Sequence, residues 1–219
     1  MKAMSSATPV TGSVETPRSI IPDMIDIAFA LEGRSVPREH RRALARAMAA
    51  VLPWLADTPG AGVHRLNVAA GGGPEALLSQ RTRLTLRVPR EREAEAAALA
   101  GAELQLGEHP LRVGAAQSRE LRPWSTLYAH VVAAEGDDEL GFLDAVRAEL
   151  QDLGVPCRPI CGRLQVLDAG TLHGYSLMLD GLSPEGALRV LATGVGAHRL
   201  LGCGLFVPHK SAAAVGSPH

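Results

Sequence analysis

The sequence predicts an α+β protein made of two tandem ferredoxin-like modules, the first over residues 22–120 and the second over residues 121–210. The main observation is an element order of β-α-β-β-α-β, read from hydrophobic periodicity and turn residues, that occurs twice. A glycine-rich segment near the end of the second module adds a loop between its last helix and its last strand. Residues 1–21 are predicted to be a disordered tail and residues 211–219 a second tail, since neither stretch has a hydrophobic period.

The first module follows from changes in hydrophobic spacing. Its predicted elements are a strand over 23–31, a helix over 38–52, strands over 63–68 and 83–88, a helix over 90–100, and a bent strand or strand pair over 103–113. Pro37 suits the first turn of the first helix, and Gly101 ends the second one. Between them, Arg83 to Val88 alternates strictly, which is typical of a half-buried strand.

The second module repeats this order. Its predicted elements are a strand over 126–134, a helix over 138–153, strands over 158–167 and 171–179, a helix over 183–192, and a last strand over 200–207. Ser183 is placed as the N-cap of the final helix, with Pro184 in its first turn. The glycine-rich loop then lies between that helix and the last strand, where it can project into the groove between the modules.

The composition is that of an ordinary globular chain. Its 219 residues can bury a workable core, and its longest apolar runs have strand length, so we expect a cytoplasmic protein with no membrane partner. Cys157, Cys161 and Cys203 are too few for a disulfide framework. Together with His209 they match zinc sites poorly, so we expect buried thiols, no metal and no cofactor.

The net charge of −1 hides an uneven distribution of charge. Between Arg34 and Arg92 there are eleven arginines against four acidic residues, whereas in residues 135–152 acidic residues predominate over the single basic residue, Arg147. A basic face is compatible with phosphate binding. The alternative is that arginine simply replaces lysine, because Lys2 and Lys210 are the only lysines, and most of these arginines are then solvated.

The glycine-rich loop is the most suggestive segment, with the sequence GVGAHRLLGCGLFVPHK over residues 194–210. Glycines this close together let the backbone approach a ligand and turn its N–H groups outward, which suits phosphate oxygens. The alternative is structural: Gly194 caps a helix, and Gly202 and Gly204 are bulge residues in a strand.

Several short segments carry a family resemblance when they are taken in their order along the chain. They are IAFALEGR (27–34), VPREH (36–40), LPWL (52–55), TLYAH (126–130), ICG (160–162), GYSL (174–177) and LLGCGLFVPHK (200–210). Over about residues 24–215 the chain resembles the CRISPR-associated repeat-processing endoribonucleases, the sixth family of Cas proteins, and more narrowly their Myxan subtype. The family is similar in fold too, with tandem ferredoxin-like domains.

The resemblance implies a metal-independent endoribonuclease that cuts precursor CRISPR RNA within its repeats. The ribose 2′-hydroxyl attacks the adjacent phosphorus, leaving a 2′,3′-cyclic phosphate and a 5′-hydroxyl, and the enzyme retains the 3′ end of the mature RNA (crRNA) in a type I surveillance complex with other Cas proteins. This chemistry needs a base for the 2′-hydroxyl, an acid for the leaving 5′-oxygen, and positively charged groups beside the negatively charged phosphorane. The alternative is a catalytically inactive subunit that only holds crRNA.

His40 is the expected proton-transfer residue, because it corresponds to the place where many family members hold a catalytic histidine. Its alternative is a surface histidine on an amphipathic helix. His209 and Lys210 form the rival catalytic site, as proton donor and as counter-charge to the phosphorane, or else only grip a phosphate. The expected RNA-binding residues are Arg34, Arg38, Arg41, Arg42, Gly194, Gly196, His198, Arg199, Gly202 and Gly204.

Aromatic residues make up only 3% of the chain, which limits base stacking. We therefore expect the repeat RNA to be recognised as a hairpin, by shape and phosphate contacts. Tyr128 and His130 lie two apart, so they project from one face of a strand, where either could orient a nucleotide. We expect them instead to be a packed core pair.

Overall fold

The computed structural model describes residues 21–69 and 73–210. The predicted tails, except Ile21, and the glycines Gly71 and Gly72 of the predicted loop lie outside the described residues. The elements of the first half are β1 (Met24–Glu32), β2 (Ser35–Pro37), α1 (Arg41–Val51), η1 (Pro53–Leu55), β3 (Gly62–Val63), β4 (Glu75–Leu77), β5 (Arg83–Pro89), η2 (Arg90–Arg92), α2 (Glu93–Ala97), β6 (Glu103–Leu106) and β7 (His109–Glu120). The elements of the second half are β8 (Thr126–Ala134), α3 (Glu139–Asp152), β9 (Arg158–Leu167), η3 (Asp168–Gly170), β10 (Leu172–Asp180), α4 (Pro184–Thr193), η4 (Arg199–Leu201) and β11 (Val207–Pro208).

The first half forms an antiparallel sheet in the order β3-β5-β1-β7-β6. Its first four strands have the ferredoxin-like arrangement, and β6 is added at the edge as a hairpin with β7. The two central strands supply the middle of the core, because Ile27 and Phe29 of β1 and Leu84 and Leu86 of β5 are fully buried. A separate two-stranded sheet joins β2 to β4.

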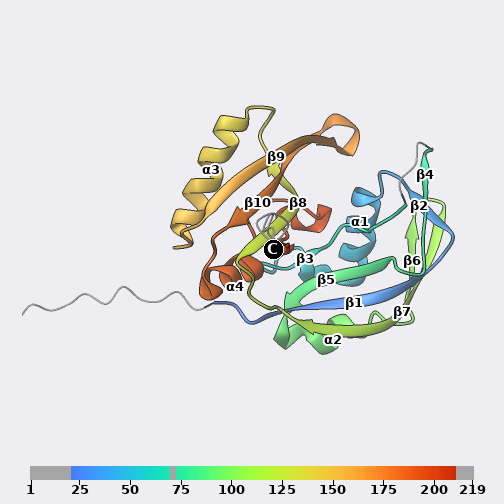
Figure 1. Ribbon diagram of the computed structural model, residues 1–219. Helices are drawn as coiled ribbons and strands as arrows, with labels where there is room; N and C mark the ends of the chain where they lie inside the picture. Colours follow the sequence, from blue (N-terminus) through green and yellow to red (C-terminus); the bar gives the residue numbers. More distant parts are fainter. Residues whose placement is uncertain (1–20, 70–72, 211–219) are drawn as a thin grey trace, which may run out of the picture.

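The second half repeats the arrangement with the strand order β11-β8-β10-β9. Helices α3 and α4 cover one face of this sheet, where Val146 of α3 and Val190 of α4 share a core with Leu127 and Leu177. The ferredoxin-like fold class predicted from the sequence is confirmed in both halves (Figure 1). The position of the boundary between the modules stays a prediction.

The structure corrects several element boundaries. The first helix begins at Arg41 rather than Arg38, because residues 35–37, including Pro37, pair with β4 as a strand. The expected strand over 63–68 is paired only at Gly62–Val63. The expected last strand over 200–207 is mostly loop: residues 199–201 form a 3-10 turn, and β11 contains only Val207–Pro208.

The final helix follows its sequence signals closely. The Ser183 side chain accepts a hydrogen bond from the Gly186 N–H at 3.0 Å, and Pro184 occupies the first helical position. Gly194 ends the helix with φ +69°, in the left-handed region that glycine tolerates best. The glycine-rich loop therefore starts where α4 ends. Within the part of the chain that the structure describes, no helix is long and apolar enough to cross a membrane.

Candidate RNA-binding and catalytic site

Helix α1 lies where the two halves of the molecule meet (Figure 1). Arg41 Nη1 donates a hydrogen bond to the Leu201 carbonyl at 2.6 Å, and Arg42 Nε donates to Asp168 Oδ1 at 2.7 Å. Leu201 belongs to the glycine-rich loop and Asp168 to the turn between β9 and β10. We call the junction where α1, β3 and β5 of the first half face the glycine-rich loop, α4, η3 and β8 of the second half the seam.

His40 stands at the start of α1 as its N-cap residue, one position before the first helical turn in which it was expected. Its side chain is buried, so the expectation of a surface histidine does not hold. The Nδ1 atom lies 3.2 Å from the Pro37 carbonyl oxygen, and Nε2 has no hydrogen-bond partner among the described residues. Loss of hydration on burial lowers the pKa of His40, and the neighbouring Arg41 lowers it further. A neutral imidazole with one free ring nitrogen can accept a proton.

The four arginines expected around His40 are divided between two places. Arg38 is tied to the segment leading into β4, because its Nε donates to the Gly73 carbonyl at 2.6 Å and its Nη2 to the Glu75 carbonyl at 2.7 Å. Arg34 lines a hollow at the same end of the molecule, beside Glu75 and His109. Only Arg41 and Arg42 reach the seam. The roles of all four in RNA binding stay predictions.

The glycine N–H groups of the glycine-rich loop are hydrogen-bonded within the protein. The N–H groups of Gly194, Gly202 and Gly204 donate to the carbonyls of Val190, Arg199 and Val131, at 2.7, 3.0 and 2.8 Å respectively. The Gly196 N–H donates to both carboxylate oxygens of Glu149, at 2.9 and 3.0 Å. The expectation that these four N–H groups point outward is therefore wrong, because neighbouring backbone and one carboxylate already accept from them.

Two further residues of the loop differ in their contacts: the Arg199 side chain is hydrogen-bonded within the loop, and the His198 side chain is exposed. Arg199 braces the loop from within, since its Nη1 donates to the Gly204 carbonyl at 3.0 Å and its Nη2 to the Gly196 carbonyl at 3.2 Å. His198 is exposed and adopts φ +62°, a backbone conformation that is costly for a residue with a side chain. Its carbonyl accepts from the N–H of Leu201 at 2.9 Å, so the turn of η4 holds it there.

His209 and Lys210 follow β11 and are exposed. The His209 ring lies 5.5 Å from the Tyr128 ring, and the Tyr128 ring lies 5.1 Å from that of His130 in an edge-to-face arrangement. His130 is exposed and Tyr128 half-buried, so the expectation of a packed core pair is wrong. The two side chains do share one face of β8, as their spacing predicted.

The comparison with protein families decides the classification. The family model described as Cas6 Crispr matches residues 25–211. The CRISPR-associated endonuclease Cas6 of Myxococcus xanthus (strain DK1622) is 34% identical over 196 residues, which is 88% of this chain and 85% of that protein. The chain belongs to the Cas6 family. This confirms the resemblance found in the sequence.

Solved structures agree with the fold. A CRISPR associated protein Cas6 superimposes with a TM-score of 0.64 at 10% identity, covering 86% of this chain and 100% of its own. The product of a Cas6-related gene from Pyrococcus furiosus gives a TM-score of 0.58 at 16% identity, covering 84% of this chain and 98% of its own. At such low identities the likeness concerns the fold alone.

One buried polar cluster of this Cas6 protein escaped sequence reasoning. Arg87 on β5 donates from Nε and Nη2 to the two carboxylate oxygens of Asp26 on β1, at 2.8 and 2.9 Å. Its Nη1 continues across the seam to the carbonyls of Leu191 and Phe206, at 2.9 and 3.0 Å. A signal was present, since Asp26 interrupts the apolar run from Met24 to Leu31 in β1. The strand register that sets it opposite Arg87 becomes visible only in the structure.

Arg65 is a second residue that the sequence did not single out. It follows β3 and is exposed, and its backbone nitrogen lies 3.1 Å from the place of a Cβ on Gly202. Loss of hydration in the seam and the positive charges of Arg65 and Arg41 lower the pKa of His130 to about 4, although its side chain still meets solvent. The seam therefore combines two guanidinium groups with a histidine that is neutral at neutral pH.

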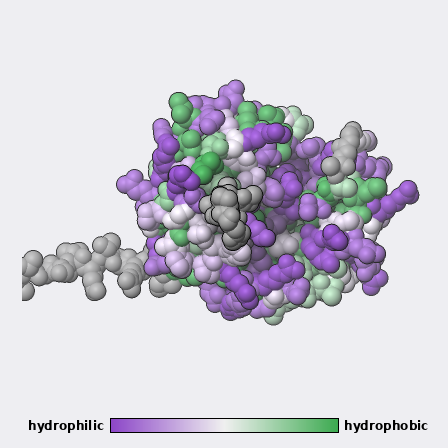
Figure 2. Space-filling view, viewed as in Figure 1, coloured by the Kyte–Doolittle hydropathy of each residue, from purple (hydrophilic) through white to green (hydrophobic). Residues whose placement is uncertain are grey.

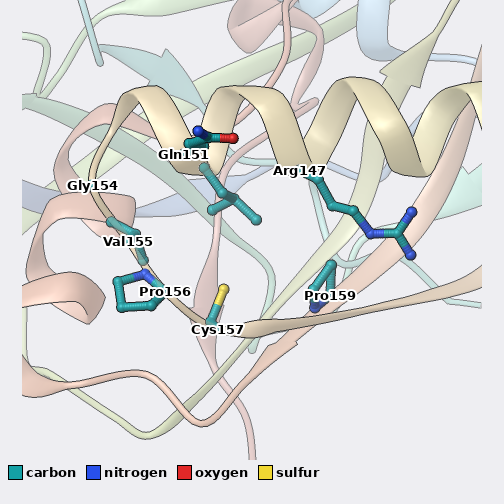
Figure 3. A pocket seen from close by; sticks show the side chains of 8 residues that line it. Arg147, Gln151, Gly154, Val155, Pro156, Cys157 and Pro159 are labelled. Atoms are coloured by element: carbon teal, nitrogen blue, oxygen red, sulfur yellow. The ribbon is translucent and has the colours of Figure 1, made fainter.

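A hollow between α3 and the start of β9 lies in the second half of this Cas6 protein, and its lining residues include none of the seam residues (Figure 3). The Cys157 sulfur points toward α3, while the Arg147 guanidinium extends away from that sulfur. Burial raises the pKa of the Cys157 thiol, which makes it a poor nucleophile at neutral pH. Within residues 21–69 and 73–210, no group of three or more His, Cys, Asp or Glu residues is placed to hold a metal ion. We assign the hollow no role.

Proposed function

We propose that this protein is a metal-independent endoribonuclease that cleaves precursor CRISPR RNA within its repeats. The observation that carries the proposal is His40: a buried histidine at the head of α1, with a free Nε2, a lowered pKa and Arg41 as its chain neighbour. Membership of the Cas6 family supports the same reading. Buried polar atoms are usually paired, so an unpaired imidazole nitrogen at the start of α1 is a candidate for contact with substrate.

The proposed reaction uses the ribose next to the scissile phosphate. His40 Nε2 takes the proton of the 2′-hydroxyl as the 2′-oxygen bonds to phosphorus, and the bond from phosphorus to the 5′-oxygen breaks. A general acid returns a proton to that leaving oxygen, which yields a 2′,3′-cyclic phosphate and a 5′-hydroxyl. His209 is the candidate acid, and Arg41 and Lys210 are candidate cations for the phosphorane. The enzyme then retains the 3′ end of the crRNA and joins other Cas proteins in a type I surveillance complex.

The RNA is proposed to cross the seam rather than lie on the loop alone. Arg41 and Arg42 start beside His40, and the exposed Arg65 lies opposite the glycine-rich loop. Figure 2 shows mostly hydrophilic residues on the face of the molecule where α1 meets the second half. Positive charge next to a neutral proton acceptor is the arrangement that phosphodiester transfer without a metal needs.

The experiment is cleavage of a repeat RNA from the cognate array in EDTA. Wild type is compared with His40→Ala and His209→Ala, and with His173→Ala as a control histidine on β10. We expect wild type and His173→Ala to cut, and His40→Ala to bind without cutting. The upstream product should lack a free 3′-hydroxyl until its cyclic phosphate is opened and removed.

Two results would contradict this assignment. Tight RNA binding by wild type without cutting would make the chain a catalytically inactive crRNA-holding subunit. Full activity of His40→Ala alongside loss of activity in His209→Ala would move proton abstraction to the rival pair.

A further inference from the structure

Three rings gather on the face of the second sheet that is turned away from α3 and α4. Leu127 and Ala129 of β8 point into the helix-covered core, so Tyr128 and His130 point to the opposite face. The His209 ring joins them, because Val207 pairs with Tyr128 and the His209 N–H donates to the Thr126 carbonyl at 3.1 Å. Ring centroids are 5.1 Å apart for Tyr128 and His130, and 5.5 Å apart for Tyr128 and His209.

These rings lie at the surface instead of in the core. His130 and His209 are exposed and Tyr128 is half-buried. The Tyr128–His130 planes meet at 82° and the Tyr128–His209 planes at 47°, so neither neighbour stacks flat on Tyr128. An amphipathic ring left at a polar surface is typical of a contact with a ligand that has an apolar face and a polar edge. A nucleobase has both.

The charges around the rings suit a nucleotide. Arg65 and Arg41 are close enough to His130 that, after loss of hydration, they contribute to lowering its pKa to about 4. His130 is therefore uncharged at neutral pH and does not repel these guanidinium groups. Aromatic rings beside cations form the usual binding surface for single-stranded nucleic acid, in which bases stack and the backbone meets positive charge.

The position on the sheet points the same way. Tyr128 lies on β8, which has β11 on one side and β10 on the other. Four-stranded ferredoxin-like sheets that bind RNA place stacking aromatics on the open face of such inner strands. Tyr128 is one of only two tyrosines in the chain, and the other two rings of the cluster are imidazoles.

We propose that Tyr128, flanked by His130 and His209, is a stacking platform for one unpaired nucleobase of the bound repeat RNA. The proposal rests on the proposed function, because it assumes that RNA crosses the seam. It assigns His209 a contact with a base as well as its candidate role in proton transfer. It adds one base contact to the hairpin recognition by shape and phosphates that the sequence predicts.

The test couples one side chain to one base. Repeat RNAs are prepared with a single abasic nucleotide at each unpaired position, and dissociation constants are measured for wild type and for Tyr128→Leu, which removes the ring but keeps apolar bulk. Tyr128→Phe keeps the ring, and Trp124→Leu is the matched control, because Trp124 is an exposed aromatic residue outside the cluster. Circular dichroism and thermal unfolding check that each variant is folded.

We expect Tyr128→Leu to weaken binding of intact RNA by roughly 5- to 100-fold, the usual range for loss of one stacked base. Tyr128→Phe and Trp124→Leu should bind within about 2-fold of wild type. An abasic nucleotide at one position should weaken RNA binding by wild type by a similar factor, and it should leave RNA binding by Tyr128→Leu unchanged.

The platform would be overturned if no abasic position affected wild type and Tyr128→Leu differently. It would also be overturned if Tyr128→Leu lost as much affinity for a hairpin that has no unpaired bases. A Tyr128→Leu protein that binds RNA normally but changes its association with another protein would also overturn it. The proposed function is tested separately. If wild type cleaves the RNA but no abasic position depends on Tyr128, only the stacking platform is disproved. If one abasic position depends on Tyr128 but wild type never cleaves, only the nuclease activity is disproved.

Discussion

Replacing Arg87 by methionine tests the buried polar cluster that links the two halves. The Arg87 side chain is 1% exposed and donates to Asp26, Leu191 and Phe206. Methionine fills much of the same space, but it leaves the Asp26 carboxylate without its counter-charge and two carbonyls without a donor. Breaking a buried ion pair from one side costs about 3–5 kcal/mol. Because the Asp26 side chain is 18% exposed, we expect the lower end, about 3 kcal/mol.

The same substitution should change how stability depends on pH. Burial alone raises the pKa of Asp26, but the Arg87 guanidinium and His64 outweigh it and hold that pKa well below its usual range. A depressed carboxyl pKa contributes stability that is present above the unfolded pKa, about 3.9, and is lost as the pH falls toward the folded pKa. Without Arg87, the buried carboxyl has a raised pKa, and protonation relieves its cost. The gap between wild type and variant should therefore shrink as the pH falls from 7 to about 4.

The assay is urea unfolding at both pH values, with Arg83→Met as the control on the same strand. Arg83 is exposed and donates to the Gln80 carbonyl at 2.6 Å, so its loss should cost no more than about 0.5 kcal/mol. The double variant Asp26→Asn with Arg87→Met should lose less than the sum of the single variants, because the unpaired charge is gone. Equal costs for the Arg87 and Arg83 variants, or a gap that does not change with pH, would refute the reasoning.

Three further predictions follow from the loop and from His40. Gly204→Ala should destabilise the fold by about 2–4 kcal/mol in thermal unfolding, because a Cβ would lie 2.0 Å from the Val195 carbonyl oxygen at φ +68°. The control Gly136→Ala should cost nothing, because its Cβ would meet no described atom within 4 Å, and equal effects of the two variants would count against the loop geometry. Glu149→Ala should tighten repeat-RNA binding about five-fold, the effect of removing one nearby like charge worth ~1 kcal/mol in water, as read by filter binding; unchanged affinity would remove Gly196 from the RNA path. Single-turnover cleavage should lose activity on acidification with a midpoint below 6.5, since burial lowers the pKa of the base His40; a midpoint above 6.5 would exclude it.

Periodicity predicted the sheets because strand alternation is a local property. The strand over Arg83–Pro89 buries Leu84, Leu86 and Val88 on alternate positions, as the sequence indicated. The start of α4 was equally clear, since a serine cap followed by proline acts within one turn. Both signals depend on a few neighbouring residues and need no knowledge of the rest of the fold.

The errors occurred where distant residues decide the outcome. Hydrophobic spacing in α3 allows Leu140 to face the core, but Leu140 is 73% exposed and Phe142 packs in the core with Val146 and Leu150. The packing of α3 on the sheet sets which residues are buried, and periodicity alone fitted both choices. Leu200 to Val207 looked like a strand because it is apolar, yet residues 199–201 form a 3-10 turn and the Arg199 side chain donates to the Gly204 carbonyl.

The candidate site was harder to predict than the fold. The sequence placed four arginines near His40, but backbone acceptors draw Arg38 toward β4 and Arg41 toward the second half. It also left the rings of Tyr128 and His209 as separate residues, because their contact depends on the pairing of β11 with β8. Contacts between residues this far apart in the chain follow from strand register, which composition and spacing do not fix.

The seam has an unequal tolerance to mutation on its two sides. Arg41 and Arg87 reach across from the first half, and their acceptors in the second half are the backbone carbonyls of Leu201, Leu191 and Phe206. Every amino acid carries such a carbonyl, so the second half can change side chains at these positions and still offer the same acceptor. Sequence change therefore endangers the Arg41 and Arg87 contacts mainly from the first half, whereas the contact of Arg42 with Asp168 needs a side chain from each half.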